Sequence, residues 1–297
     1  MASTPHEGRT GVRTVGVDLA KADTTTAVCT IDWTPYGAVV SAPVLPASNA
    51  VVLAAANAPG VVAVALDAPF GWPTAMVAAV SSWRPGGRWA DPKDQAFRLR
   101  RTDDVTATCT SKAVETARKS GASGLHAAVP LSVSADKIAM AAWRCCKLLD
   151  QLAHDPHNPV EVVTDAMGQA FAVDGRNRVV EAYPAAALAM WGIPREGYKK
   201  ADEVAKGVRQ VMLGAILRGV GDGWLHGAPG VLELYTATDH ALDALVCALV
   251  ARAAMLGLVD AVPTDDREAA RAEGWIALPR ADSLRSLSQR GTPTAGR

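Results

Sequence analysis

The sequence predicts an α/β fold in which a mixed β-sheet is flanked by helices. Short apolar runs rich in β-branched residues alternate with amphipathic stretches, as expected for strands and helices that share one core. A turn signal between two early strands indicates a hairpin, and helices separate the later strands. With 297 residues, 49% of them hydrophobic, the chain is long enough for one big domain or two modest ones.

The first predicted elements are strands. RTVGVDLA (13–20) alternates into an apolar run and predicts a central strand that ends at Asp18. TTTAVCTIDW (24–33) and GAVVSAPVL (37–45) predict the next two strands, and the TPYG between them is typical of a hairpin turn. A serine cap and a terminal glycine bound a short helix over 48–60.

The rest of the chain alternates helices with short strands. VVAVALDAPFGWP (61–73) predicts a buried strand that ends at Asp67, because a proline follows two residues later. A helix that opens with proline follows over 73–83, whereas residues 84–110 are expected to be irregular and basic. The remaining expected elements are, in order, a Ser-capped helix over 134–154, strands over 160–166 and 178–184, and helices over 201–219 and 238–254.

Residues 13–280 are expected to form one continuous domain with a basic insertion at about 84–110. The polar residues 1–12 are expected to be a flexible N-terminus, and residues 281–297, rich in Ser, Arg, Gly and Thr, a disordered tail. The formal net charge is zero, which excludes a strong overall electrostatic footprint for nucleic acid but leaves room for a local basic patch.

The composition favours a cytoplasmic location and no membrane contact. The segment MASTPHEGRTGVRT lacks the apolar centre of a signal peptide, and no apolar run is as long as a membrane span. The five cysteines lack metal-ligand spacing and are typical of reduced core cysteines. The sequence leaves the oligomeric state open.

Acidic residues stand at the ends of three predicted strands and at the start of the last long helix. Ligand sites gather at the carboxyl ends of strands in α/β sheets, and Asp18, Asp67 and Glu181 occupy such ends. Asp239 and Asp243 lie one turn apart on nearly the same helix face. Buried carboxylates side by side are costly unless a cation or donors compensate, and hard divalent cations prefer such oxygen ligands.

Each acid also has a structural alternative. Asp239 follows Thr238 and would serve equally well as a helix cap or as a complement to the helix dipole. Asp243 would be satisfied by a buried ion pair with an arginine such as Arg252. The acids at the strand ends would fit turn hydrogen bonds or an ordinary surface position.

The basic stretch FRLRRTDD supplies candidate phosphate ligands. Arg98, Arg100 and Arg101 stand close together, and arginine binds phosphate through its planar fork. On an extended segment, Arg98 and Arg100 would point to the same side. The alternative is a surface cluster in which these arginines pair with Asp103 and Asp104.

Three further positions carry weaker signals. Lys199 and Lys200 form a second small basic spot, which we expect to be solvated. His240 lies between the paired acids, but about 100° away from its neighbour on a helix. We therefore expect His240 to support a ligand rather than to bind a metal itself.

Six motifs carry a family resemblance: GVDLAK, LDAPFGWP, FRLRRTDDV, PLSVSADKIAMAAWR, EAYPAAALAMWG and DHALDALVCAL. In this order they resemble the bacterial family called domain-of-unknown-function 429, whose members are predicted RNase H-like nucleases. The match spans roughly residues 14–280 and includes a closing EGWIALP. The helix start with its paired acids also resembles that of Holliday-junction resolvases, which share the RNase H-like fold.

The resemblance implies a five-stranded mixed sheet whose first three strands are antiparallel. It also implies that Asp18, Asp67 and either Asp243 or Asp239 bind the metal, and Glu181 matches another acid motif of the family. One segment departs from the family pattern, since KADTTT stands where many members have Gly-Trp after the first acid. The family pattern therefore predicts neither the shape of this loop nor a role for Lys21.

The leading hypothesis is Mg²⁺- or Mn²⁺-dependent hydrolysis of phosphodiester bonds in a nucleic acid or nucleotide. The five acids would form the catalytic set, and Lys21, Arg98 and Arg101 would contact the substrate. One alternative is a binding or regulatory module that kept an RNase H-like fold without catalysis. A second is an actin-like ATP-dependent phosphotransferase, although VDLAK lacks the Gly-Thr or Gly-Ser that should follow the first acid.

Overall fold

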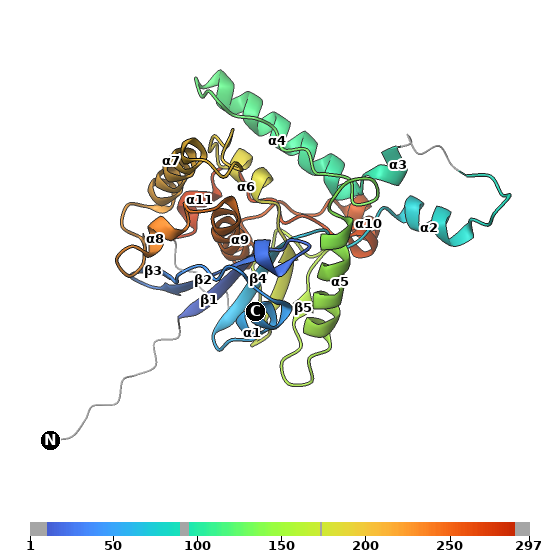
Figure 1. Cartoon of the computed structure of the whole chain (residues 1–297), viewed down its shortest axis with the longest axis horizontal. Helices are drawn as coiled ribbons and strands as arrows, with labels where there is room; N and C mark the ends of the chain where they lie inside the picture. Colours follow the sequence, from blue (N-terminus) through green and yellow to red (C-terminus); the bar gives the residue numbers. More distant parts are fainter. Residues whose placement is uncertain (1–10, 90–94, 173, 289–297) are drawn as a thin grey trace.

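A seven-stranded mixed sheet forms the centre of the computed structural model, which describes residues 11–89, 95–172 and 174–288 (Figure 1). The strand order is β5-β6-β4-β1-β2-β3-β7. The first three strands pair antiparallel, and the other neighbouring pairs are parallel. The strands are β1 (Val12–Asp18), β2 (Ala27–Thr34), β3 (Gly37–Val40), β4 (Val61–Asp67), β5 (Glu161–Val162), β6 (Arg178–Glu181) and β7 (Leu225–His226).

The mixed sheet and its antiparallel start are confirmed, but the sheet has seven strands rather than five. The two-residue strands β5 and β7 extend it at its two edges. The residue pattern predicted a strand around β5 and missed β7, because a pairing of two residues leaves no alternation for a sequence to show.

Helices cover both faces of the sheet (Figure 1). Alternate residues of β4 enter two different cores: Val64 and Leu66 pack with α1 and α5, whereas Ala63 and Ala65 pack with α6, α7 and α9. None of the helices in the described ranges combines the length and the apolar character that crossing a bilayer requires. The helices are α1 (Asn49–Ala56), α2 (Thr74–Ser82), α3 (Gln95–Arg98), α4 (Arg101–Lys119), α5 (Ala139–Ala153), α6 (Pro184–Met190), α7 (Glu203–Val220), α8 (Val231–Leu234), α9 (Asp239–Met255), α10 (Arg267–Glu273) and α11 (Ser283–Ser286), with 3-10 turns η1 (Asp23–Thr25) and η2 (Thr264–Asp266).

Most predicted helices are confirmed, although α5 begins later than expected. The Ser48 cap of α1 is confirmed. Helix α5 begins at Ala139 rather than after Ser134. The expected irregular stretch over 84–110 is wrong at Gln95–Arg98, which form α3, and from Arg101 onward, where α4 begins. The buried face of α4 consists largely of Thr102, Asp103, Thr106 and Thr110, so it shows no apolar periodicity.

The expected boundaries also change at the C-terminal end. Residues 281–288 are ordered by α11, so the predicted disorder is wrong there. Leu284 and Leu287 are buried in the same core as α7 and α9. Residues 289–297 lie outside the described part, as do residues 1–10 of the expected flexible N-terminus.

Helix α9 lies directly on β1 at Gly16. A Cβ atom at this position would stand 2.1 Å from the backbone nitrogen of Ala248 and 2.2 Å from the carbonyl oxygen of Ala244. Every residue of α9 from Ala241 to Ala254 is buried, in agreement with its all-round apolar sequence. The close crossing brings the first turns of α9 to the end of β1.

Replacing Gly16 with alanine should therefore destabilise the protein by about 3 kcal/mol or more, since α9 must move away from the sheet. Urea unfolding of the two proteins measures this difference. Gly207→Ala is the matched control, because no atom lies within 4 Å of a Cβ placed there in α7. The control should gain up to about 1 kcal/mol of stability from its helix propensity. Equal stability of Gly16→Ala and the native chain would contradict the close crossing.

Candidate metal centre

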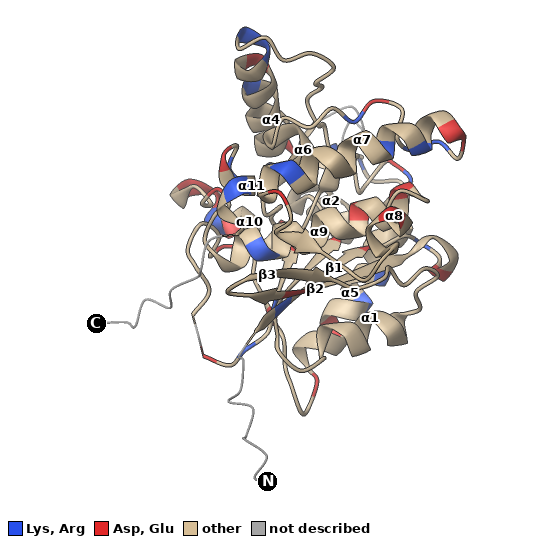
Figure 2. Cartoon of the chain, turned by 90° about the vertical axis from the view of Figure 1, so that its left-hand side faces the viewer, with Lys and Arg blue, Asp and Glu red and all other residues tan. Residues whose placement is uncertain are grey.

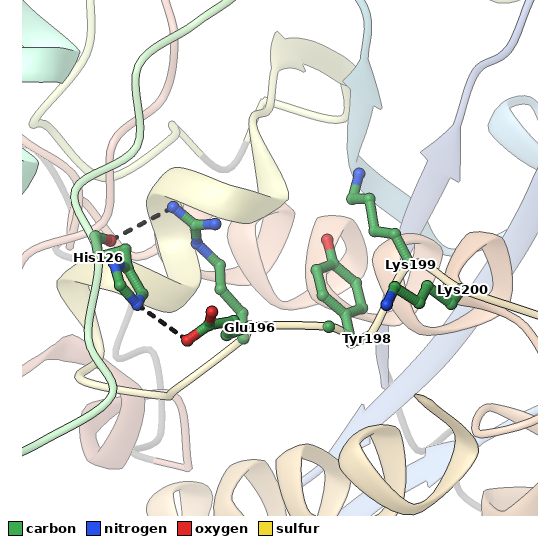
Figure 3. A pocket seen from close by; sticks show the side chains of 7 residues that line it. His126, Glu196, Tyr198, Lys199 and Lys200 are labelled. Carbon is green, nitrogen blue, oxygen red and sulfur yellow. Dashed lines mark hydrogen bonds and ion pairs between the residues drawn. The ribbon is translucent and has the colours of Figure 1, made fainter. Parts of the chain in front are cut away.

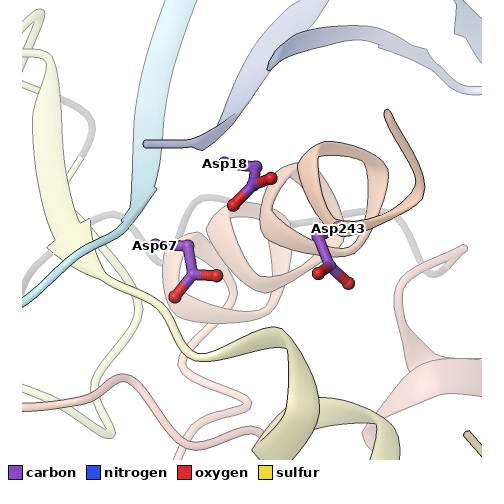
Figure 4. A group of neighbouring side chains, drawn as sticks. All are labelled: Asp18, Asp67 and Asp243. Atoms are coloured by element: carbon purple, nitrogen blue, oxygen red, sulfur yellow. The ribbon is translucent and has the colours of Figure 1, made fainter. Parts of the chain in front are cut away.

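Three aspartates from separate elements converge where the central strands β1 and β4 end (Figure 4). Asp18 ends β1 and lies opposite Asp67 at the end of the parallel strand β4. Asp243 comes from the second turn of α9. One carboxylate oxygen from each residue lies within 4.8 Å of the other two. We call these three residues the aspartate triad.

Burial raises the pKa values of all three carboxyls, and the charges of neighbouring acids add to this shift. Desolvation is the largest cause for Asp67, whose pKa is raised well above the ordinary range, and the charges of Asp18 and Asp243 add to it. Desolvation also raises the pKa of Asp243 to about 7, although Lys199 opposes this shift. The pKa of Asp18 is raised by burial against the opposing hydrogen bond with His240. A bound cation would therefore stabilise the ionised carboxylates of the triad.

Three neighbouring side chains orient the triad. His240 Nδ1 lies 2.6 Å from Asp18 Oδ2, and this hydrogen bond is the main cause of the raised pKa of His240. The Tyr198 hydroxyl lies 3.0 and 3.1 Å from the two oxygens of Asp243. Lys199 Nζ lies 3.3 Å from Asp243 Oδ2, while 59% of the lysine side chain remains exposed. The expected solvated role of Lys199 is thus replaced by an ion pair with a buried acid.

Of the structural alternatives for the helix acids, one is supported, since Asp239 lies in the first turn of α9, where its charge complements the helix dipole. Thr238, and not Asp239, caps α9, because its hydroxyl accepts a hydrogen bond from the amide of Ala241. Asp239 is half-buried in the first helical turn and lies outside the triad. The Asp243–Arg252 pair is excluded, since nine residues of helix separate these side chains by about 13.5 Å. The Arg252 guanidinium instead lies over the Trp33 ring and donates to a backbone carbonyl.

Glu181 also lies where a central strand ends, but it is held by a buried arginine. It ends β6 opposite Leu66 of β4, next to the strand end that carries a triad residue. Arg100 donates to both carboxylate oxygens of Glu181 at 2.8 and 2.7 Å and pairs with Asp103 at 2.9 Å. The backbone amide of Phe70 donates to the same glutamate. Glu181 therefore has a permanent counter-charge and lies outside the triad.

The three expected substrate contacts are scattered. Lys21 is exposed in the loop after β1, and Arg98 is exposed at the end of α3. Arg101 forms an exposed ion pair with Asp266, with Nε 2.7 Å from Oδ1. The expected alignment of Arg98 with Arg100 on an extended segment is wrong, because Arg100 is buried. Of the surface-cluster alternative, the pairing of Arg100 with Asp103 is confirmed, whereas the expected surface position of Arg100 is wrong.

A family model described as "Protein of unknown function (DUF429)" matches residues 16–268, more than four fifths of the chain. The chain belongs to this family. The matched region of DUF429 contains the whole aspartate triad together with Arg100, Glu181, Tyr198 and Lys199. No curated protein and no solved structure matches the chain. The family description assigns no activity, so the chemistry of the site must carry the functional argument.

Breaking the Arg100 network should cost far more than breaking the neighbouring surface pair. Arg100→Met leaves Glu181 and Asp103 buried without a counter-charge, and we expect a loss of about 3–5 kcal/mol. Arg101→Met, the matched control, removes an exposed pair and should cost about 1 kcal/mol or less. Urea unfolding compares the two variants. Equal losses would show that the Arg100 network does not hold this edge of the sheet together.

Proposed function

We propose that this protein is a divalent-metal-dependent phosphodiesterase that acts on a nucleic acid or a nucleotide. The observation that carries the proposal is the convergence of three aspartate side chains, with one oxygen of each within 4.8 Å of the others. Carboxylate oxygens are the ligands that Mg²⁺ and Mn²⁺ prefer in proteins. Such an ion would offset a repulsion that the surrounding side chains only partly relieve.

The donor set and its surroundings fit such an ion. Asp18 keeps 13% of its side-chain surface exposed, whereas Asp243 is 2% exposed. The triad is thus anchored on the protein side and reachable on the other. Mg²⁺ in enzymes usually keeps waters and substrate oxygens among its ligands, and an open side is what this requires.

Each neighbouring side chain has a definite task in this proposal. A divalent ion at the triad would supply a more acidic bound water and would neutralise charge on phosphoryl oxygens. The hydrogen bond to His240 fixes the orientation of the Asp18 carboxylate. Tyr198 does the same for Asp243, and the Lys199 ammonium places a positive charge where a phosphate group would approach.

The sheet supports an RNase H-like assignment of the fold, which we include in the proposal. Its five central strands follow the order β6-β4-β1-β2-β3, with β1, β2 and β3 antiparallel. Two triad residues end neighbouring central strands, and the third comes from a helix that crosses the same sheet. This arrangement fits what the family resemblance implies.

Mn²⁺ should stabilise the native chain through the triad. At roughly 100 times its Kd, a bound ion adds about 2.7 kcal/mol to the free energy of unfolding, which appears as a rise in Tm. Asp67→Asn should lose most of this rise, and Asp239→Asn, the matched control at the start of α9, should keep it.

Hydrolysis of bis(p-nitrophenyl) phosphate should likewise require Mn²⁺ and fall about 100-fold in Asp67→Asn. A metal effect of the same size in all three proteins would refute the triad as the site, and metal binding without hydrolysis would favour a non-catalytic module.

Metal affinity should rise with pH across neutrality. Because the pKa of Asp243 is raised from its ordinary value of 3.8 to about 7, the folded metal-free protein holds a proton that the unfolded chain has lost. The metal-free protein should therefore lose stability as the pH rises from about 4 through 7. A metal must displace that proton, so its affinity should increase about tenfold in total between pH 6 and 8, with most of the increase below pH 7. Calorimetric titration with Mn²⁺ measures this slope, and an affinity that stays constant over this range would contradict the assignment.

A further inference from the structure

An open pocket lies beside the loop that carries Tyr198 and Lys199 (Figure 3). Its volume is about 410 Å³, and it is lined by His126 and by the continuous segment from Arg195 to Lys200. Two of these lining residues, Tyr198 and Lys199, also contact Asp243. The pocket and the candidate metal centre therefore share a wall.

The pocket carries an excess of basic side chains. Its basic residues are Arg195, Lys200 and Lys199, of which Lys199 is paired with Asp243, and its single acid, Glu196, lies 3.2 Å from the imidazole of His126. Arg195 is fixed at the wall, because its Nε and Nη2 donate to the carbonyls of Ala185, His126 and Ala127. A charge held in this way costs little entropy when an anion binds.

A buried arginine fixes the segment that carries the two lysines. Arg209 of α7 is 2% exposed, and its Nη1 donates to the carbonyl oxygens of Tyr198 at 2.6 Å and Lys200 at 2.9 Å. These bonds set the direction in which Lys199 and Lys200 leave the chain. Lys199 pairs with Asp243 of the triad, whereas Lys200 is exposed at the pocket, and Figure 3 shows the two side chains pointing in different directions.

We propose that this pocket binds a phosphate group of the substrate and takes a single nucleotide unit beside the triad. The proposal rests on the proposed function and names the substrate class of the same site. A pocket of this size accepts a ligand of small-molecule dimensions rather than a length of duplex. Lysine ammonium groups and a fixed guanidinium are the groups that bind phosphate.

The distribution of charge over the chain agrees with a small or terminal substrate unit. The formal net charge is zero, and Figure 2 shows Lys and Arg positions interspersed with Asp and Glu positions along the ribbon on the side in view. A protein that follows a long duplex neutralises many phosphates and needs a correspondingly basic surface. A local pocket with a few basic groups is sufficient for one nucleotide.

Calorimetric titration of the full chain with adenosine 5′-monophosphate, inorganic phosphate and adenosine tests the proposal. A chelator in the buffer makes the result independent of any metal. We expect saturable binding of the monophosphate, weaker binding of inorganic phosphate and none of adenosine. Lys200→Gln should weaken binding of the monophosphate about tenfold, the effect of one lost charge-assisted contact. Lys147→Gln is the matched control, since it removes the same charge from an exposed position on α5, across the sheet.

Three results would overturn the pocket as a phosphate site: no saturable binding of the monophosphate, equal binding of adenosine, or equal affinities in Lys200→Gln and Lys147→Gln. Inorganic phosphate binding as tightly as the monophosphate would overturn the single nucleotide unit. Lys200 does not contact the triad carboxylates, so Lys200→Gln should keep the full Mn²⁺-induced rise in Tm. That second measurement separates failure of this pocket from failure of the metal site.

Discussion

The backbone contact between α9 and β1 at Gly16 is the constraint on which the candidate site depends. A helix can lie this close to a strand only where the strand residue lacks a Cβ atom, and here the missing atom would stand 2.1 Å from the helix backbone. The contact fixes the depth and rotation of α9 over the sheet, and thereby places Asp243 beside the ends of β1 and β4. The apolar surface that α9 buries offsets the cost of holding three carboxylates in the same region.

Two groups of acids lie near the ends of the central strands, and different basic partners balance their negative charges. Glu181 and Asp103 share Arg100, which is buried, always charged and bound to each carboxylate through its planar fork. Within the described residues, the basic partners of the triad are the partly exposed Lys199 and His240. A buried arginine paired with two carboxylates is a permanent structural partner. A partly exposed lysine is more readily displaced from its carboxylate by a divalent ion. This contrast separates the acids that hold the fold together from the acids proposed to bind metal.

The sequence predicted the strand ends at Asp18 and Asp67 and the buried helix that follows Asp239, because alternation, proline and apolar runs are local signals. It missed α4, since threonines and an aspartate form the buried face of that helix. It also missed Tyr198 and Lys199 as partners of Asp243, because no spacing or periodicity links a loop to a helix more than 40 residues later. The choice of Asp243 over Asp239 likewise depends on how α9 is rotated against the sheet, which a helical pattern buried on all sides does not encode.

The most direct test of the central claim is anomalous diffraction from crystals grown with Mn²⁺. We predict a manganese peak within about 2.1 Å of carboxylate oxygens of Asp18, Asp67 and Asp243, with Lys199 displaced from Asp243. Crystals of the Asp67→Asn variant should lack that peak. Two results would contradict this assignment. One is no manganese peak at the triad in crystals grown with saturating Mn²⁺, and the other is a manganese peak at Glu181 alone.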